Sequence, residues 1–149
     1  DSRIAKNKTF CKNIQEKLAN TYYNEMSVGI DMEAYDTLEY CKINGLPWET
    51  AKAFDSSAHI GEFISLKDIE NISDISISLF INGKCMIKSN ISKMIFSFDE
   101  IISHISKFHV LKMGDYIFTG SPIFNYTVDI NDKIECFIND QKLLWFTVK

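Results

Sequence analysis

The sequence predicts an α+β fold that is rich in short strands and has about three helices set against them. Alternation of apolar and polar residues, which is typical of strands, recurs along the chain, for example at residues 75–80. Residues 97–100 read Ser-Phe-Asp-Glu, a capping box that predicts the start of an amphipathic helix. The 149 residues have the length of one ordinary domain, so we expect a single domain over residues 1–149.

Helical periodicity predicts three helices, at residues 12–24, 33–44 and 97–108. Apolar side chains recur every four positions in the first, and an apolar stripe follows one side of the second. Gly45 can close the second helix in the left-handed conformation, and Pro47 cannot continue it.

Short apolar or alternating runs predict the strands. They lie at residues 26–30, 75–80, 84–88, 116–119, 133–138 and 143–148. Asn82-Gly83 is the clearest hairpin signal, because both residues tolerate the positive φ that a two-residue turn requires. Residues 48–66 show no clear period.

Composition excludes several classes of partner. The net charge of −4 offers no basic surface for nucleic acid or for an anionic membrane. No apolar run approaches the roughly 20 residues that span a bilayer.

None of the four cysteines forms a CxxC pair or a zinc spacing, which is typical of idle thiols in a reducing compartment. With no secretion signal at Asp1, we expect a cytoplasmic or mitochondrial protein that is not secreted.

Lys52 is the first candidate functional residue. Its sequence neighbours Ala51, Ala53 and Phe54 are apolar, and an amine in such surroundings binds an anion more strongly than one in water. Trp48, one helical turn earlier, is expected to be a large apolar anchor. The alternative is a surface lysine whose aliphatic stem covers apolar neighbours.

Five stretches form a collinear pattern along nearly the whole chain. They are residues 29–36, 45–55, 92–97, 114–122 and 131–135. In this order and spacing they resemble the C-terminal catalytic domain of the fumarylacetoacetate hydrolase family, above all its small acylpyruvate hydrolases and oxaloacetate decarboxylases. The resemblance implies a mixed sheet rolled into a barrel-like core and assembly as a homodimer. It also implies that the N-terminal portion of that domain is missing from residues 1–149.

The resemblance implies a metal site. The family binds Mg²⁺ through an aspartate and a Glu-x-Glu pair, and Asp31 matches the aspartate; hard oxygen ligands are those that Mg²⁺ prefers. Asp1 falls where the second glutamate of the pair is expected, and Ser56 where some members place a hydroxyl ligand behind the lysine. The expected cofactor is therefore Mg²⁺, or Mn²⁺ or Ca²⁺ in its place. The alternative for Asp31 is ordinary placement at a helix N-terminus.

The resemblance also implies how substrate is held. Lys52 matches the active-site lysine, whose positive charge would steady an enolate or a keto-acid carboxylate. Ser121 matches a turn hydroxyl that holds the substrate carboxylate; the alternative is a plain turn residue beside Pro122. Tyr35 stands where the family has a substrate-binding arginine and is expected to face the substrate in its place.

Three departures from the family pattern affect the substrate side. They are Tyr35 for arginine, Leu38 for a glutamine, and bulky residues 123–126 in place of a glycine-rich loop. A phenol cannot clamp a carboxylate through two parallel hydrogen bonds as arginine does. Either the pocket takes a less anionic substrate, or catalysis has been lost.

Three functional hypotheses follow. The first is a Mg²⁺-dependent hydrolase or decarboxylase that cleaves a C–C bond in a β-keto or β-diketo acid, with an acylpyruvate-like small molecule as its substrate. The second is a degenerate, non-catalytic family member that acts as a binding or dimerising scaffold. The third is an unrelated α+β binding domain, which would make the five motif matches coincidental.

Overall fold

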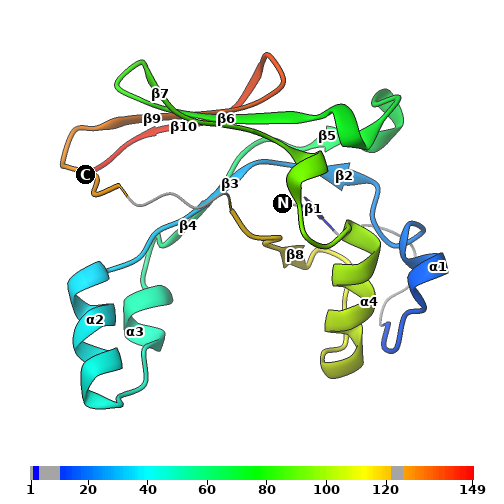
Figure 1. The fold of residues 1–149 in the computed structure, drawn as a ribbon, viewed down its shortest axis with the longest axis horizontal. Helices are drawn as coiled ribbons and strands as arrows, with labels where there is room; N and C mark the ends of the chain where they lie inside the picture. The colour runs from blue at the N-terminus through cyan, green and yellow to red at the C-terminus, as the bar shows by residue number, and fades with distance from the viewer. Residues whose placement is uncertain (1, 4–10, 122–125) are drawn as a thin grey trace.

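The computed structural model describes residues 2–3, 11–121 and 126–149, whose strands form three sheets (Figure 1). Every strand pairing in these ranges is antiparallel. Two features named from the sequence lie outside the described residues: Asp1 as a metal ligand, and most of the bulky loop, at residues 123–125.

The elements follow one another as short pieces. The helices are α1 (Glu16–Ala19), α2 (Tyr35–Asn44), α3 (Glu49–Lys52) and α4 (Phe98–Phe108), with 3-10 turns η1 (Leu66–Asp68), η2 (Ile72–Asp74) and η3 (Ile91–Lys93). One sheet has the order β5 (Ile64–Ser65), β2 (Glu25–Met26), β1 (Ser2–Arg3), β8 (Tyr116–Ile117). The second has the order β10 (Gln141–Thr147), β9 (Lys133–Ile138), β6 (Ser76–Ile81), β7 (Lys84–Asn90), and the third pairs β3 (Gly29–Asp31) with β4 (Ala58–Ile60).

The α+β class and its richness in strands are confirmed, but the sheets do not close into a barrel. Closure requires every strand to have a neighbour on both sides. In the described chain β10 and β7 each pair with a single neighbour, so the second sheet keeps two edges. The sheets are also antiparallel rather than mixed where they are described.

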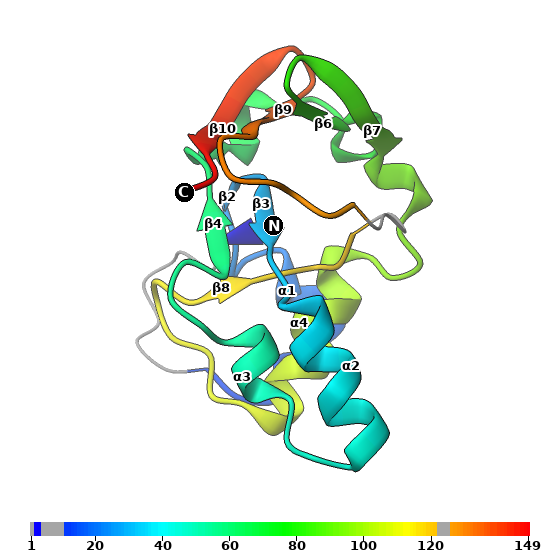
Figure 2. The same cartoon turned by 90° about the vertical axis from the view of Figure 1, so that its left-hand side faces the viewer.

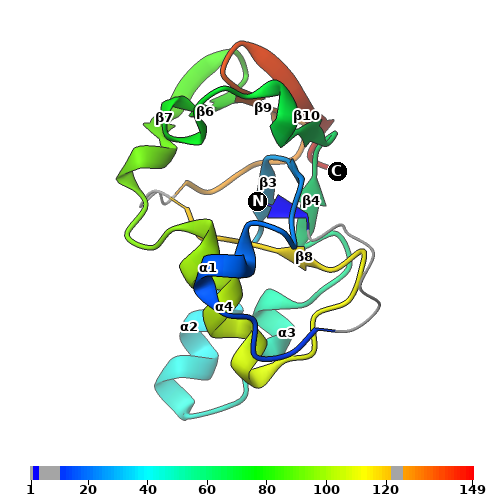
Figure 3. The same cartoon turned by 90° about the vertical axis from the view of Figure 1, so that its right-hand side faces the viewer.

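The first expected helix is much shorter than predicted, because the chain before it is bonded to α4 instead. Asn13 has a positive φ of 56°, which a continuous helix does not allow. The backbone N–H of Ile14 donates to the Ser106 hydroxyl at 2.8 Å, and that of Asn13 to the Ser106 carbonyl at 2.9 Å. These bonds leave only α1 as helix, lying beside α4 (Figure 3).

The expected strand at residues 26–30 is divided between two sheets. Ser27, at the break, is buried, and its hydroxyl donates to the Glu62 carbonyl at 2.9 Å. The next carbonyl, that of Val28, accepts from the Gly61 N–H at 2.9 Å. The chain therefore passes from β2 to β3 through contacts with residues that are distant in sequence.

The core consists of two clusters of buried side chains. The larger joins α1 and α4 to the first two sheets, and it comprises Ile14, Ala19, Tyr23, Met26, Ile75, Phe98, Ile102, Leu111, Ile117, Ile138 and Leu143. The smaller lies on the inner face of the second sheet and comprises Ile81, Ile134, Cys136 and Leu144. Burial raises the pKa of the Cys136 thiol to about 12, so this cysteine is a packing residue.

The β3–β4 ribbon leads away from this core and ends in a pair of helices (Figures 1 and 2). α2 follows β3 and α3 precedes β4, and the Ala34 N–H donates to the Ala51 carbonyl at 3.0 Å across the pair. Gly45 closes α2 with φ of 63°, as predicted. Trp48 is 53% exposed in the described structure, so its expected role as an apolar anchor is wrong.

None of the helices in the described ranges has the length and apolarity that crossing a bilayer requires.

The capping box of α4 provides a test of local stability. The Ser97 hydroxyl accepts from the Glu100 N–H at 3.2 Å, and the Glu100 carboxylate accepts from the Ser97 N–H at 2.7 Å. Because Ser97→Ala leaves the first of these donors unsatisfied, we expect it to lower the free energy of unfolding by about 1 kcal/mol in urea denaturation. Ser103→Ala, the same substitution inside α4, is the control and should cost less. Equal losses would contradict the role of the cap.

Gly61 provides a second test, because a Cβ added there would lie 2.5 Å from the Leu143 carbonyl oxygen. The Leu143 carbonyl is part of the backbone, so it cannot move aside as a flexible side chain could. We expect Gly61→Ala to lower the free energy of unfolding by about 2 kcal/mol or more. Gly45→Ala, where no atom lies within 4 Å but φ is positive, should cost about 1 kcal/mol. A smaller loss at Gly61 than at Gly45 would contradict the close approach.

Candidate functional site

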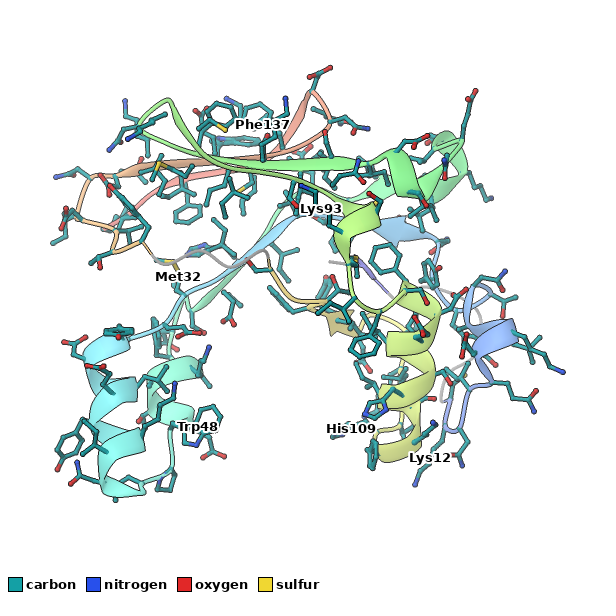
Figure 4. The ribbon with its side chains drawn as sticks, in the orientation of Figure 1. Lys12, Met32, Trp48, Lys93, His109 and Phe137 are labelled. Atoms are coloured by element: carbon teal, nitrogen blue, oxygen red, sulfur yellow. The ribbon has the colours of Figure 1, made fainter. Side chains whose placement is uncertain are left out.

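Asp31 and Lys52 meet where the β3–β4 ribbon joins the helix pair. Asp31 is the last residue of β3, and Lys52 is the last residue of α3. The Lys52 Nζ lies 3.9 Å from the Asp31 Oδ2. Met32, labelled in Figure 4, marks this junction. The structure thus brings together the carboxylate and the ammonium that were singled out from the sequence.

The structure adds Glu33 to this pair. Its carboxylate contacts the Lys52 ammonium directly, in a hydrogen-bonded ion pair. The sequence analysis missed Glu33, although a signal was present: residues two apart in an extended segment point to the same side. Asp31 and Glu33 have that spacing at the end of β3. We call Asp31, Glu33 and Lys52 the carboxylate–lysine cluster.

The cluster is only partly shielded from water. The side chains of Lys52, Asp31 and Glu33 are 32%, 55% and 39% exposed. The expected apolar surroundings of Lys52 are therefore wrong for its charged end, which lies between two carboxylates. With both carboxylates ionised the cluster has a net charge of −1, so in this arrangement it attracts cations and repels anions.

The structure gives the other predicted site residues surroundings of their own. The Tyr35 hydroxyl donates to Glu39 Oε1 at 3.1 Å along its own helix, and this bond raises the pKa of the Tyr35 phenol. Ser56 is exposed in the turn after α3, where its φ is 65°. Ser121 is exposed beyond β8, next to the residues that are not described. Their roles in binding metal or substrate stay predictions.

His59 is used in packing. It lies on β4, and its backbone pairs with Ile30 on β3. Its ring stacks on Phe146, with ring centroids 3.9 Å apart and an angle of 14° between the planes. This stacking joins the ribbon to β10, and it explains the position of His59 without a catalytic role.

The donor set of the cluster suits part of a divalent-cation site. Asp31 and Glu33 offer hard carboxylate oxygens, the ligands that Mg²⁺ and Mn²⁺ prefer. Within the described ranges, however, no three His, Cys, Asp or Glu side chains are grouped so that they could hold a metal ion. A bound cation would therefore need further oxygens from water, from substrate or from residues outside these ranges.

Known structures share this fold. A fumarylacetoacetate hydrolase family protein from Yersinia pestis superimposes with a TM-score of 0.89 at 27% identity, over 99% of this chain and 66% of its own. The fumarylpyruvate hydrolase of Pseudomonas aeruginosa, in complex with Mn²⁺ and pyruvate, gives a TM-score of 0.87 at 29% identity, over 99% of this chain and 62% of its own.

Sequence comparison agrees with the structural likeness. The C-terminal domain of fumarylacetoacetate (FAA) hydrolase matches residues 6–148. The mitochondrial oxaloacetate tautomerase FAHD1 of Homo sapiens is 34% identical over 139 residues, which are 93% of this chain and 63% of that protein. Its counterpart in Mus musculus is 37% identical over 136 residues, 91% of this chain and 62% of that protein.

The chain belongs to the fumarylacetoacetate hydrolase family, and the resemblance noted in its five motifs is confirmed. Known members are enzymes, among them an oxaloacetate tautomerase and a fumarylpyruvate hydrolase. The chain spans less than two thirds of the length of these two relatives, 63% and 62% respectively. The activity of the whole protein is therefore a matter for proposal.

The partial exposure of the cluster predicts that it contributes little to stability. An ion pair that water can reach is typically worth less than about 1 kcal/mol. Lys52→Met keeps the aliphatic stem and removes the charge, so we expect the free energy of unfolding to change by less than about 1 kcal/mol in urea. Ile102→Ala, at a side chain that is 1% exposed, serves as the reference and should cost about 2–5 kcal/mol. A comparable loss at Lys52 would show that the cluster is structural.

Proposed function

We propose that the protein is a Mg²⁺-dependent hydrolase or decarboxylase that cleaves a C–C bond in a β-keto or β-diketo acid, with an acylpyruvate-like substrate. The observation that supports it most is the 3.9 Å approach of the Lys52 ammonium to the Asp31 carboxylate at the end of β3. Among the relatives, one is named for oxaloacetate and another was crystallised with Mn²⁺ and pyruvate, so both are associated with small keto acids.

In this proposal the negative Asp31 binds the cation and the positive Lys52 stabilises the enolate. Asp31, exposed at the end of its strand, would provide an oxygen ligand to the cation. A bound divalent cation polarises carbonyl and enol oxygens and so lowers the cost of forming an enolate. Lys52 would place its ammonium beside the enolate oxygen that becomes negative as the C–C bond breaks, which is where a fixed positive charge is most effective.

The environment of Tyr35 favours a substrate that has no second carboxylate. At this position a phenol replaces the arginine that the family pattern leads one to expect, and its hydroxyl is bonded to Glu39. A neutral phenol next to a carboxylate would not attract a second acidic group on the substrate. We therefore propose an acylpyruvate whose acyl end is uncharged.

We further propose that the protein works as a homodimer in the cytoplasm or in mitochondria, without nucleic acid or membrane as a partner. Human and mouse relatives are named as mitochondrial proteins. The net charge of −4 supports the absence of a polyanionic partner.

One observation favours the second hypothesis, a non-catalytic binding or dimerising scaffold. Two of the three side chains expected to meet the substrate are bonded to carboxylates of the protein itself, Lys52 to Glu33 and Tyr35 to Glu39. If these bonds persist when ligand is present, no cationic group of the cluster is left to hold a keto acid.

Turnover separates the two hypotheses. We expect the full chain to cleave an acylpyruvate with an uncharged acyl end when Mg²⁺ is added, and to lose that activity when EDTA removes the cation. Lys52→Met should lower kcat by about 100-fold to 1,000-fold, because the charge that stabilises the enolate is gone. Lys42→Met, an equally conservative change at an exposed lysine of α2, should leave kcat within a few-fold of the original. Equal rates for the unchanged protein and Lys52→Met would exclude this role of Lys52.

A further inference from the structure

Glu33 has no part in the proposed reaction, yet its carboxylate contacts the Lys52 ammonium directly in an ion pair. We propose that Glu33 is a specificity-determining residue: an internal carboxylate that occupies Lys52 until an incoming keto acid displaces it. The inference rests on the proposed function for the class of ligand.

The backbone on both sides of Glu33 is fixed against the segment that follows α2. The Met32 N–H donates to the Ser57 carbonyl at 2.7 Å, and the Ala34 N–H donates to the Ala51 carbonyl at 3.0 Å. Ser57 and Ala51 lie on either side of Lys52 in the sequence and are both buried. The fold therefore places the backbone of Glu33 opposite the segment that carries Lys52, and the two side chains are within reach of one another.

The charge of the cluster gives Glu33 an effect on binding. Glu33 places a negative charge directly beside Lys52, whether or not a cation neutralises Asp31, and this charge opposes a carboxylate that approaches the ammonium. Once Glu33 turns aside, the ammonium can bind the incoming carboxylate in its place. The side chains of Glu33 and Lys52 are 39% and 32% exposed, so water can solvate Glu33 when it is displaced.

Because Glu33 must be displaced, it discriminates between ligands by charge. A ligand with a carboxylate replaces the ion pair between Glu33 and Lys52 with one of its own. A neutral analogue leaves that ion pair in place and gains no binding free energy from Lys52. Removing the charge of Glu33 should therefore strengthen binding of the acid and leave binding of a neutral amide unchanged. From the usual worth of an exposed ion pair, we expect the gain in affinity to be about fivefold.

The test measures dissociation constants by isothermal titration calorimetry on the full chain with saturating Mg²⁺. Pyruvate is the anionic probe and pyruvamide is its neutral counterpart. We compare the unchanged protein with Glu33→Gln, which keeps the size of the side chain and removes its charge. Asp36→Asn, at an exposed carboxylate three residues further on, is the control for the change in net charge.

Glu33→Gln should bind pyruvate about fivefold more tightly, with no change for pyruvamide and little change for Asp36→Asn. Adding Lys52→Met to Glu33→Gln should abolish the gain. Glu33→Asp, whose shorter side chain reaches Lys52 less well, should give an intermediate affinity and serves as a second variant. Unchanged or weaker pyruvate binding by Glu33→Gln would overturn the inference, and so would the absence of pyruvate binding by every variant.

The results would differ if only the proposed catalytic function were wrong. Glu33→Gln would then still bind pyruvate more tightly than the unchanged protein, in a way that depends on Lys52. Neither the unchanged protein nor Glu33→Gln would turn over a β-keto acid. Tighter binding together with turnover would support both proposals.

Discussion

The pairing of β3 with β4 is the constraint on which the site depends. Its register sets Asp31 opposite Ala58, and the hydrogen bonds continue beyond the strands through Met32 to Ser57 and Ala34 to Ala51. This ladder brings the end of one strand against the helical turn that ends in Lys52. Without it, the two charged groups would belong to separate loops, and neither Asp31 nor Glu33 would have a reason to lie near an ammonium.

Local signals in the sequence predicted the parts of the fold that are determined locally. The capping box of Ser97, the left-handed Gly45 and the Asn82-Gly83 hairpin need only neighbouring residues, and the structure has all three. The division of the strand at Ser27 and the shortening of α1 were not predictable, because hydrogen bonds to Glu62 and Ser106, distant in sequence, decide them. The four-residue α3 is too short to show a period.

The same distinction holds for the site. Motif resemblance predicted Asp31 and Lys52 as a pair, and the structure places them 3.9 Å apart. Glu33 escaped notice because no motif assigned it a role and its partner lies on another element. The apolar neighbours of Lys52 in sequence suggested a dry anion site, but side-chain direction is set by the tertiary fold, which turns the ammonium toward two carboxylates. The result is a lysine whose charge is already compensated, which shapes what the cluster can bind.

The accessibility of Lys52 to a small reagent tests the carboxylate–lysine cluster most directly. Acetic anhydride labelling of the native protein, followed by mass spectrometry of its peptides, gives a rate for each lysine. The cluster predicts that Lys52, held between Asp31 and Glu33, is acetylated several-fold more slowly than the exposed Lys42, and that the difference disappears when Asp31→Asn and Glu33→Gln are combined. Equal rates at Lys52 and Lys42 in the unchanged protein would contradict the cluster.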